Sequence, residues 1–162
     1  MLIGFEPIIA KDPKVLILGS MPSVTSLELQ EYYGYRHNRF WKIMSRCFAM
    51  PIDTYAEKKQ IIYRNHLILW DVIHSCEREG SLDSKIRNET VNPIDQLAAR
   101  YPTLHTVICN GKKSETLYLR YFSGLDLTLY SLPSTSNANR TIKEDILFER
   151  WITSLHDSLE MK

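Results

Sequence analysis

The sequence predicts one α/β domain over residues 1–162, with a three-layer α/β/α arrangement around a central four-stranded, mainly parallel sheet. Short apolar runs recur along the chain, and each is long enough for one buried strand. Segments with helical spacing of apolar residues separate these runs, and this alternation is typical of doubly wound folds. The length of 162 residues and the hydrophobic fraction of 44% also suit a single globular domain.

The first expected strand is Lys14–Leu18, whose continuous apolar residues before Gly19 suit a buried strand better than an alternating, half-exposed one. Similar runs predict the other strands at His66–Trp70, Leu104–Cys109 and Leu125–Leu132. Helical spacing predicts the elements between and after the strands. The expected helices are Asn38–Phe48, Thr54–Tyr63, Pro93–Arg100, Lys112–Phe122 and Ile142–Leu159.

Irregular stretches follow each expected strand. They are Ser20–His37, Ser75–Val91, Asn110–Gly111 and Pro133–Arg140. A compact domain rarely keeps long loops that have no function. In an open parallel sheet the four stretches would meet at the carboxyl edge of the strands, where ligands bind. We therefore expect the functional site at this edge.

Composition excludes several classes of protein. Twenty Lys and Arg against nineteen Asp and Glu leave a net charge of +1, so any nucleic-acid-binding face must be local. The cysteines Cys47, Cys76 and Cys109 are too far apart in sequence for a zinc, iron–sulfur or redox-dithiol motif. No signal peptide or membrane span is recognisable. We expect a soluble, cytoplasmic protein with free thiols and no metal or organic cofactor.

The turn Gly19–Ser23 leaves the first strand through a glycine and a proline, and its backbone N–H groups could face an anion or the edge of a base. It lacks the lysine of a nucleotide-triphosphate loop, and a simple strand-to-loop connection also explains it. Asn110 ends the third strand with an amide that offers a donor and an acceptor side by side, as recognition of a base edge requires. Asn-Gly is also a common turn pair.

Aromatic and basic residues alternate after the first long loop. Between Glu31 and Arg46 there are four Lys and Arg against one acid, a local net charge of +3. Rings interleaved with cations suit stacking on an exposed base beside contacted phosphates. Phe40, Trp41 and Met44 could equally form the inward face of a helix. The hydroxyl-rich stretch before Arg140 suits either phosphate contacts or turn and N-cap duty.

The order of these segments over roughly Val15–Arg140 resembles the uracil-DNA glycosylase superfamily. Within it, the chain is most similar to the hypoxanthine-DNA (deoxyinosine) glycosylase group. The motifs that carry this resemblance are Gly19–Ser23, Tyr32–Gly34, Asn38–Trp41, Gly80–Ser84 and Leu132–Ser136. The stretch Asn38–Lys42 also resembles mismatch-specific uracil/thymine glycosylases, in which an aromatic residue five positions earlier, here Tyr33, stacks on the flipped base.

The resemblance implies a monofunctional DNA glycosylase that hydrolyses the N-glycosidic bond of a deaminated base, with hypoxanthine favoured, in base excision repair. DNA with a deaminated base would be its partner, and we expect a monomer that needs no membrane, metal or iron–sulfur cluster. A uracil or G/U mismatch-specific glycosylase remains an alternative, as does a non-catalytic nucleic-acid-binding module on the same fold. The residues alone also leave open a flavodoxin-like or nucleoside-handling protein that binds a small phosphate ligand at the Gly19 turn.

The resemblance also implies roles for single residues. The functionally important Asn of the hypoxanthine group corresponds to Asn38, which we expect to orient the attacking water by position alone. The residues expected to bind the flipped base are Gly19, Ser20, Met21, Tyr33 and Asn110. The residues expected to contact DNA are Ser23, Arg36, Arg39, Lys42, Ser134, Ser136 and Arg140. The uracil specialists carry an Asp or Asn in the first motif, where this chain has Ser20 and Met21, so uracil should be the weaker substrate.

Overall fold

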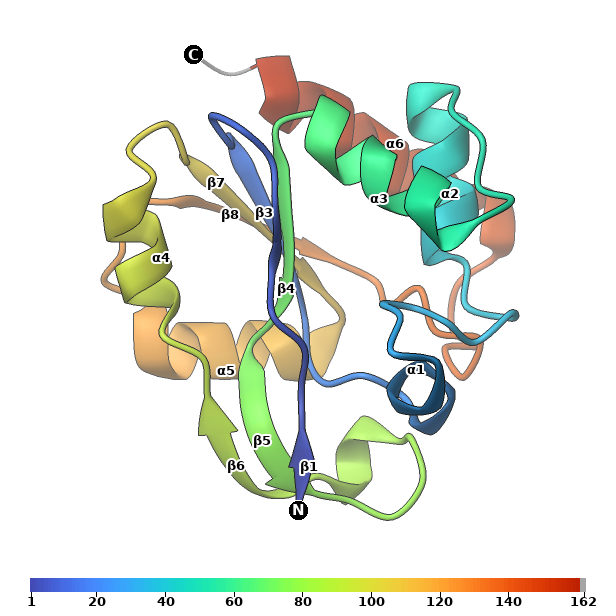
Figure 1. Cartoon of the computed structure of the whole chain (residues 1–162), viewed down its shortest axis with the longest axis vertical. Helices are drawn as coiled ribbons and strands as arrows, with labels where there is room; N and C mark the ends of the chain where they lie inside the picture. The colour runs from blue at the N-terminus through green and yellow to red at the C-terminus, as the bar shows by residue number, and fades with distance from the viewer. Residues whose placement is uncertain (161–162) are drawn as a thin grey trace.

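The centre of the computed structural model, which describes residues 1–160, is a five-stranded sheet with the strand order β2-β4-β3-β7-β8 (Figure 1). Residues 161 and 162 of the expected domain lie outside the described residues. The parallel strands are β3 (Val15–Gly19), β4 (Leu67–Asp71), β7 (Thr106–Asn110) and β8 (Thr128–Leu132). The fifth strand, β2 (Ile8–Ile9), runs antiparallel to β4. The expected count of four strands is wrong because this two-residue strand is too short to form a recognisable apolar run.

Helices cover both faces of this sheet, as the sequence predicts (Figure 1). One face packs against α2 (Phe40–Phe48), α3 (Tyr55–Arg64) and α6 (Glu144–Glu160). The other face packs against α4 (Ile94–Arg100) and α5 (Lys112–Phe122). Side chains of a strand alternate between its faces, and every residue of β3, β4 and β7 is accordingly buried. None of the helices described over residues 1–160 is long and apolar enough to cross a membrane.

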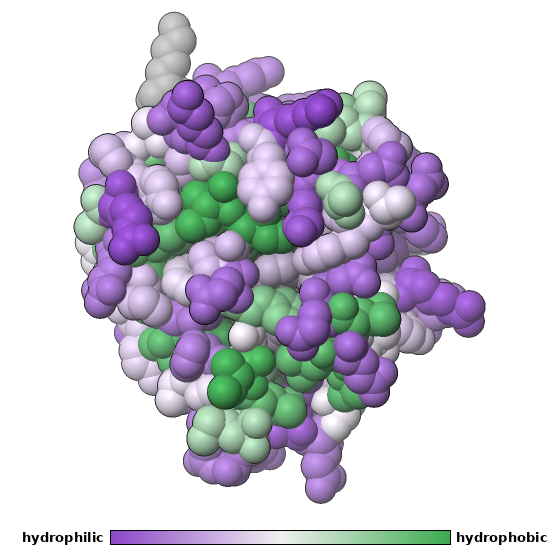
Figure 2. All heavy atoms as spheres, viewed as in Figure 1, coloured by the Kyte–Doolittle hydropathy of each residue, from purple (hydrophilic) through white to green (hydrophobic). Residues whose placement is uncertain are grey.

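The expected irregular stretch Ser75–Val91 is largely a β-hairpin, which corrects the sequence-based expectation. Strand β5 (Ile73–Glu77) pairs with both β6 (Arg87–Val91) and β1 (Leu2–Ile3) in a second, antiparallel sheet of order β1-β5-β6. Register shifts interrupt the pairing of β5 with β6, and most side chains of β6 are exposed, so no apolar pattern marks it. Figure 2 shows hydrophobic side chains among hydrophilic ones in the half of the molecule that holds this sheet.

The expected loop Ser20–His37 contains a further element, the six-residue helix α1 (Val24–Leu29). The Ser23 side chain caps it by accepting a hydrogen bond from the backbone N–H of Ser26, at 3.1 Å. Two helices begin two residues later than expected, α2 at Phe40 and α6 at Glu144.

All four parallel strands end at one edge of the sheet. Gly19 lies beside Asp71 in the register of β3 and β4, and Asn110 lies beside Leu132 in that of β7 and β8. The β5–β6 hairpin continues from β4 after the single residue Val72, which places a second sheet next to this edge (Figure 1). The long connections of the chain therefore gather where the sequence predicts a site.

Candidate active site

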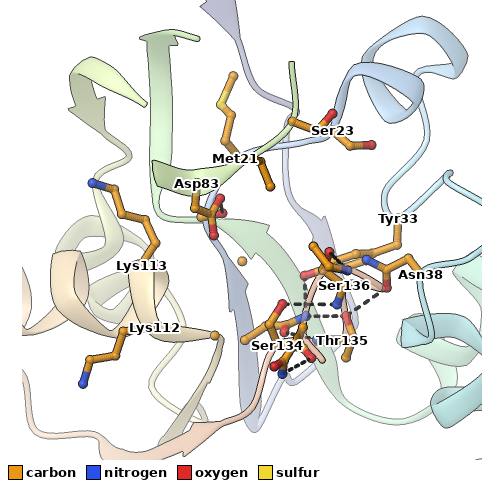
Figure 3. Close-up of a pocket in the computed structure, with 18 of the residues that line it drawn as sticks. Met21, Ser23, Tyr33, Asn38, Asp83, Lys112, Lys113, Ser134, Thr135 and Ser136 are labelled. Carbon is orange, nitrogen blue, oxygen red and sulfur yellow. Dashed lines mark hydrogen bonds between the residues drawn. The ribbon is translucent and has the colours of Figure 1, made fainter. Parts of the chain in front are cut away.

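A cavity of about 1130 Å³ lies at the carboxyl edge of the parallel strands, and we call it the edge cavity. The strand ends Gly19, Asp71 and Asn110 line it, together with the aromatic segment, the hairpin tip and the loop after β8. Figure 3 shows Tyr33, Asn38 and the Ser134–Ser136 segment close together, with Asp83 and the lysines of α5 elsewhere around the opening. Concave sites of this kind, with a few converging polar groups, bind small molecules and extruded chemical groups.

Tyr33 is held firmly in the wall of this cavity. Its ring stacks on Phe40, with centroids 4.1 Å apart and an interplanar angle of 24°. Its hydroxyl oxygen accepts a hydrogen bond of 3.1 Å from Nδ2 of Asn110. Its φ of +52° lies in the left-handed region that non-glycine residues seldom adopt, and such strain often marks functional positions. Burial and the nearby Asp71 raise the pKa of this phenol, so it stays neutral.

Asn38 combines a structural contact with a free donor. Its Oδ1 accepts hydrogen bonds from the backbone N–H of Phe40 and from Oγ1 of Thr135, each at 2.9 Å. A backbone N–H can only donate, so the oxygen and nitrogen of this amide are unambiguous. Nδ2 has no partner among residues 1–160, and Asn38 lines the edge cavity. The amide thus offers N–H groups to a ligand while its oxygen stabilises the start of α2.

Asn110 connects this arrangement to the sheet. Its Nδ2 donates to both Tyr33 and Oγ1 of Thr135, each at 3.1 Å, while its Oδ1 accepts from the backbone N–H of Thr135 at 3.0 Å. The residue is only 8% exposed. Because both N–H groups already donate within the protein, a base could receive one only by displacing Tyr33 or Thr135.

The turn after β3 brings the expected base-binding residues Gly19, Ser20 and Met21 to the lining of the edge cavity. A Cβ atom at Gly19 would lie 2.4 Å from Oδ1 of Asp71 and 2.7 Å from the Tyr33 hydroxyl, so only glycine fits there. Oγ of Ser20 donates a 2.7 Å hydrogen bond to Oδ1 of Asp83, and Met21 is a buried part of the lining.

Asp71 is a cavity residue that the sequence reasoning missed. It is 4% exposed, and its Oδ2 has no hydrogen-bond partner among the described residues. Burial and the neighbouring Asp83 raise its pKa to about 7, although the Arg78 guanidinium opposes this shift. A detectable signal existed, since Asp71 directly follows the apolar run of β4 just as Asn110 follows that of β7.

Other residues at the cavity were also unassigned by the sequence. Thr135 is fully buried and joins Asn38 to Asn110. Asp83 lies at the tip of the β5–β6 hairpin, beside a 54% exposed Leu82. Their contacts join distant segments, so the sequence showed only the motifs that contain them, Gly80–Ser84 and Leu132–Ser136.

The expected DNA-contacting residues fall into two groups. Ser23, Ser134 and Ser136 line the edge cavity. The expected cations Arg39, Lys42 and Arg140 line a second space of about 520 Å³, which we call the basic hollow, and Arg36 does not. The other residues that line the basic hollow are His37, Asn137, Asn139, Ile142 and Glu144. Asn137 and Asn139 also line the edge cavity, so the two spaces adjoin.

Two of the cations expected to contact DNA already form hydrogen bonds within the protein. The Arg39 guanidinium donates to the backbone carbonyls of Thr135, Ser136 and Asn139, so it braces the loop after β8. Arg36 is exposed, and its Nε forms a 3.2 Å hydrogen bond with the ring of His37. Lys42 and Arg140 are the exposed cations of the basic hollow that make no hydrogen bond or ion pair among residues 1–160.

The described part of the chain contains no cluster of side chains that could bind a metal ion. Within residues 1–160 no group of three His, Cys, Asp or Glu side chains is placed to hold an ion. Cys47, Cys76 and Cys109 are free, and the last two are buried.

Fold and site together define a class of protein, namely a three-layer α/β protein whose parallel strands end at a polar cavity beside a cationic hollow. The family model of the uracil DNA glycosylase superfamily matches residues 6–156. The chain belongs to the uracil DNA glycosylase superfamily, and it is a DNA glycosylase of that superfamily. The family resemblance predicted from the motifs is confirmed.

Individual proteins are similar over nearly the whole chain. A hypoxanthine DNA glycosylase of Methanosarcina acetivorans is 34% identical over 144 residues, which cover 88% of this chain and 90% of the relative. One of Methanosarcina barkeri is 34% identical over 139 residues, or 85% of this chain and 87% of the relative. A solution NMR structure described as a uracil DNA glycosylase of Methanosarcina acetivorans superposes with a TM-score of 0.85 at 32% identity and covers 98% of each chain.

Proposed function

We propose that this DNA glycosylase hydrolyses the N-glycosidic bond of hypoxanthine in DNA as a step of base excision repair. The observation that carries the proposal is the hydrogen-bonded cluster of Tyr33, Asn38 and Asn110 at a cavity beside cations. Two relatives at 34% identity are named hypoxanthine DNA glycosylase, which supports this choice of base. The Ser20–Met21 turn, which carries no carboxylate or amide, supports it as well.

Base capture comes first in the proposed reaction. A base must leave the duplex to reach the edge cavity, which costs a few kcal/mol and is easiest for a mispaired base. Stacking on Tyr33 would offset about 1 to 3 kcal/mol of this cost. The Tyr33 ring is already fixed by Phe40 and by Asn110, so little conformational freedom is lost when the base arrives.

Bond cleavage makes the sugar resemble an oxocarbenium ion and shifts electrons onto the base. Donors aimed at the departing base stabilise this state more than the ground state. We propose the backbone N–H groups of the turn at Ser20 and Met21 as such donors. Asn38 would hold the attacking water through Nδ2, because its Oδ1 is engaged with Phe40 and Thr135. A carboxamide scarcely accepts a proton, so its contribution is orientation.

DNA contacts are proposed for the two adjoining spaces. Lys42 and Arg140 in the basic hollow would contact phosphates, while Ser134 and Ser136 would lie beside the flipped nucleotide. Arg39 would act indirectly because it fixes the loop that carries both serines.

The test is a panel of labelled oligonucleotides that carry deoxyinosine, uracil, xanthine or a normal base, incubated with enzyme and chelator and then treated with alkali. We expect strand breaks at deoxyinosine and weaker cleavage at uracil. Equal or faster release of uracil would favour a uracil glycosylase instead. Tight binding to mismatched DNA without an abasic product would favour a non-catalytic binding module.

A further inference from the structure

The wall of the edge cavity contains a carboxyl group, that of Asp71, which takes no part in base stacking or in holding the attacking water. Asp71 is 4% exposed and lines the cavity at the end of β4. Its Oδ1 lies 2.4 Å from the position that a Cβ of Gly19 would occupy, and the Tyr33 hydroxyl lies 2.7 Å from the same position. The carboxyl group therefore sits between the first turn and the ring expected to receive the base.

Asp71 lacks the contacts that buried carboxylates usually have. Its Oδ2 has no hydrogen-bond partner in the part of the chain that the structure describes. Buried ionised groups are normally paired or hydrogen-bonded, since an unpartnered charge is costly to bury. The side chain forms no hydrogen bond or ion pair within residues 1–160, so a role toward a ligand is the simplest explanation for keeping it.

Charged and titratable groups from each neighbouring segment surround this carboxyl group. Asp83 and Arg78 approach from the β5–β6 hairpin, whereas Tyr33 and Tyr32 approach from the aromatic segment. Arg78 donates to the carbonyls of Pro22 and Gly80 and forms no ion pair with Asp71 among residues 1–160.

The balance of these groups shifts Asp71 toward its protonated form. Burial and Asp83 outweigh Arg78, and together they raise the pKa of Asp71 to about 7. Near neutral pH a substantial share of the molecules therefore carries a proton on this side chain.

The chemistry of the leaving base decides what such an acid can do. A base that departs as an anion would be repelled by an ionised Asp71, which would slow the reaction. A purine carries basic ring nitrogens outside the glycosidic bond, so a delivered proton lets it depart neutral. Uracil has no such nitrogen, because N1 forms the glycosidic bond and N3 already carries hydrogen. A carboxylic acid at this position therefore suits a purine.

We propose that Asp71 is the general acid that protonates a ring nitrogen of the departing purine and thereby makes hypoxanthine, rather than a pyrimidine, the base this cavity releases. The proposal rests on the proposed function. In the step, the O–H bond of Asp71 breaks and an N–H bond forms on the base, while the electron pair of the C1′–N9 bond moves to the base. Water oxygen bonds to C1′ and its surplus proton passes to solvent, from which Asp71 is protonated again.

The test measures single-turnover release of hypoxanthine from DNA from about pH 5.5 to about pH 9 for the wild type, Asp71→Asn and Asp95→Asn. Asp95 is exposed on α4 and outside both spaces, so its variant is a matched control and should behave as wild type. We expect the wild-type rate to fall about tenfold per pH unit above about pH 7, and Asp71→Asn to be about 10² slower at pH 6 without that fall.

A second variant changes the pKa of Asp71 by altering its neighbour Asp83. Asp83→Asn removes the charge that raises the pKa of Asp71 but keeps an acceptor for Ser20, so the falling limb of the pH profile should move to lower pH. A purely structural role of Asp71 would leave this limb in place, so an unmoved limb would overturn the proposal. This arm also decides the question if Asp71→Asn fails to fold.

The two levels of the hypothesis fail differently. A wild type that releases no hypoxanthine overturns the proposed function and the acid role together. A wild type that releases hypoxanthine at a rate independent of pH, or an Asp71→Asn variant within about threefold of it, overturns the acid role alone.

Discussion

The oxygen and the nitrogen of the Asn38 amide have different surroundings. Oδ1 holds the first N–H of α2, and Nδ2 faces the edge cavity. Asn38→Ala should therefore lower the single-turnover rate by about 10² or more and also cost about 1 kcal/mol of unfolding free energy.

Asn38→Asp separates these effects, since a carboxylate still accepts from Phe40 and Thr135 but offers no N–H. We expect its melting temperature to match the wild type while its rate falls as far as that of Asn38→Ala. Melting curves measured beside single-turnover rates decide the matter. An Asn38→Ala protein that melts lower but cleaves normally would contradict the catalytic assignment.

Tyr33 should act through its ring more than through its hydroxyl. Tyr33→Ala should weaken binding to deoxyinosine DNA by about 1 to 3 kcal/mol and also lower the rate, since stacking on the flipped base is lost. Tyr33→Phe keeps the ring on Phe40 and loses only the acceptor for Asn110, so its binding should be close to that of the wild type. Titrations of labelled DNA measure both; equal losses for the two variants would contradict stacking.

Asp71 should make stability depend on pH. Its pKa is about 7 in the folded protein and 3.8 for an unperturbed side chain, so the folded state binds more protons between these values. Stability due to this group therefore falls as pH rises from about 4 to about 7, and the loss is complete above that. Asp71→Asn removes the loss and should stabilise the protein by up to about 4 kcal/mol at pH 8, and far less at pH 4. Urea unfolding at the two pH values tests this; an equal effect at both would contradict it.

At the scale of elements, the loop after β8 depends on one side chain from the start of α2. Arg39 donates to three of its carbonyls, at Thr135, Ser136 and Asn139. Arg39→Ala should cost about 1 kcal/mol or more and increase amide exchange across 135–139, because these carbonyls lose charged donors. Lys42→Ala, from the exposed face of α2, should leave exchange unchanged. Hydrogen-exchange measurements on both variants show whether Arg39 stabilises the loop through its hydrogen bonds or whether the loss of any positive charge on α2 has the same effect.

The sequence predicted the buried strands well and the exposed or short elements poorly, because only buried strands and longer helices carry a clear apolar pattern. Strands β3, β4 and β7 are buried on both faces, so they read as continuous apolar runs. Strand β6 is mostly exposed and irregularly paired, and it carries no such signal. The helix α1 is only six residues long, too short for helical periodicity to show.

The candidate site was predictable only in part, because its contacts join segments that are far apart in sequence. Residues that end strands, such as Asn110, could be placed at the carboxyl edge from topology alone. The bond between Thr135 and Asn38 spans 97 positions, and no local pattern indicates it. Asp71 ends β4 as Asn110 ends β7, with β3 between the two strands. The burial of Asp71 nevertheless depends on the hairpin and on Tyr33, which the sequence could not place.

On the scale of the whole molecule, a net charge of +1 is compatible with strong salt dependence. Lys42 and Arg140 are gathered in one hollow, and each phosphate contact releases counterions from DNA. Binding should therefore weaken as salt rises, and Lys42→Ala or Arg140→Ala should each reduce the slope of log affinity against log salt by about 1. Fluorescence titrations across a salt series measure the slopes; an affinity unchanged by salt would remove the basic hollow from the binding face.

In the hydrogen-bonded cluster at the cavity, the donor and the acceptor of each hydrogen bond are also fixed. The peptide N–H of Phe40 can only donate, which makes the Asn38 oxygen an acceptor, and Thr135 therefore directs its hydroxyl hydrogen toward Asn38. Thr135 must then accept from Asn110, which in turn directs an N–H toward the Tyr33 oxygen. The phenolic hydrogen is left to point away from Asn110. The peptide N–H groups of Phe40 and Thr135 thus set the orientation of the Tyr33 hydrogen across the wall of the cavity, and an incoming base meets a pattern of donors and acceptors that already exists.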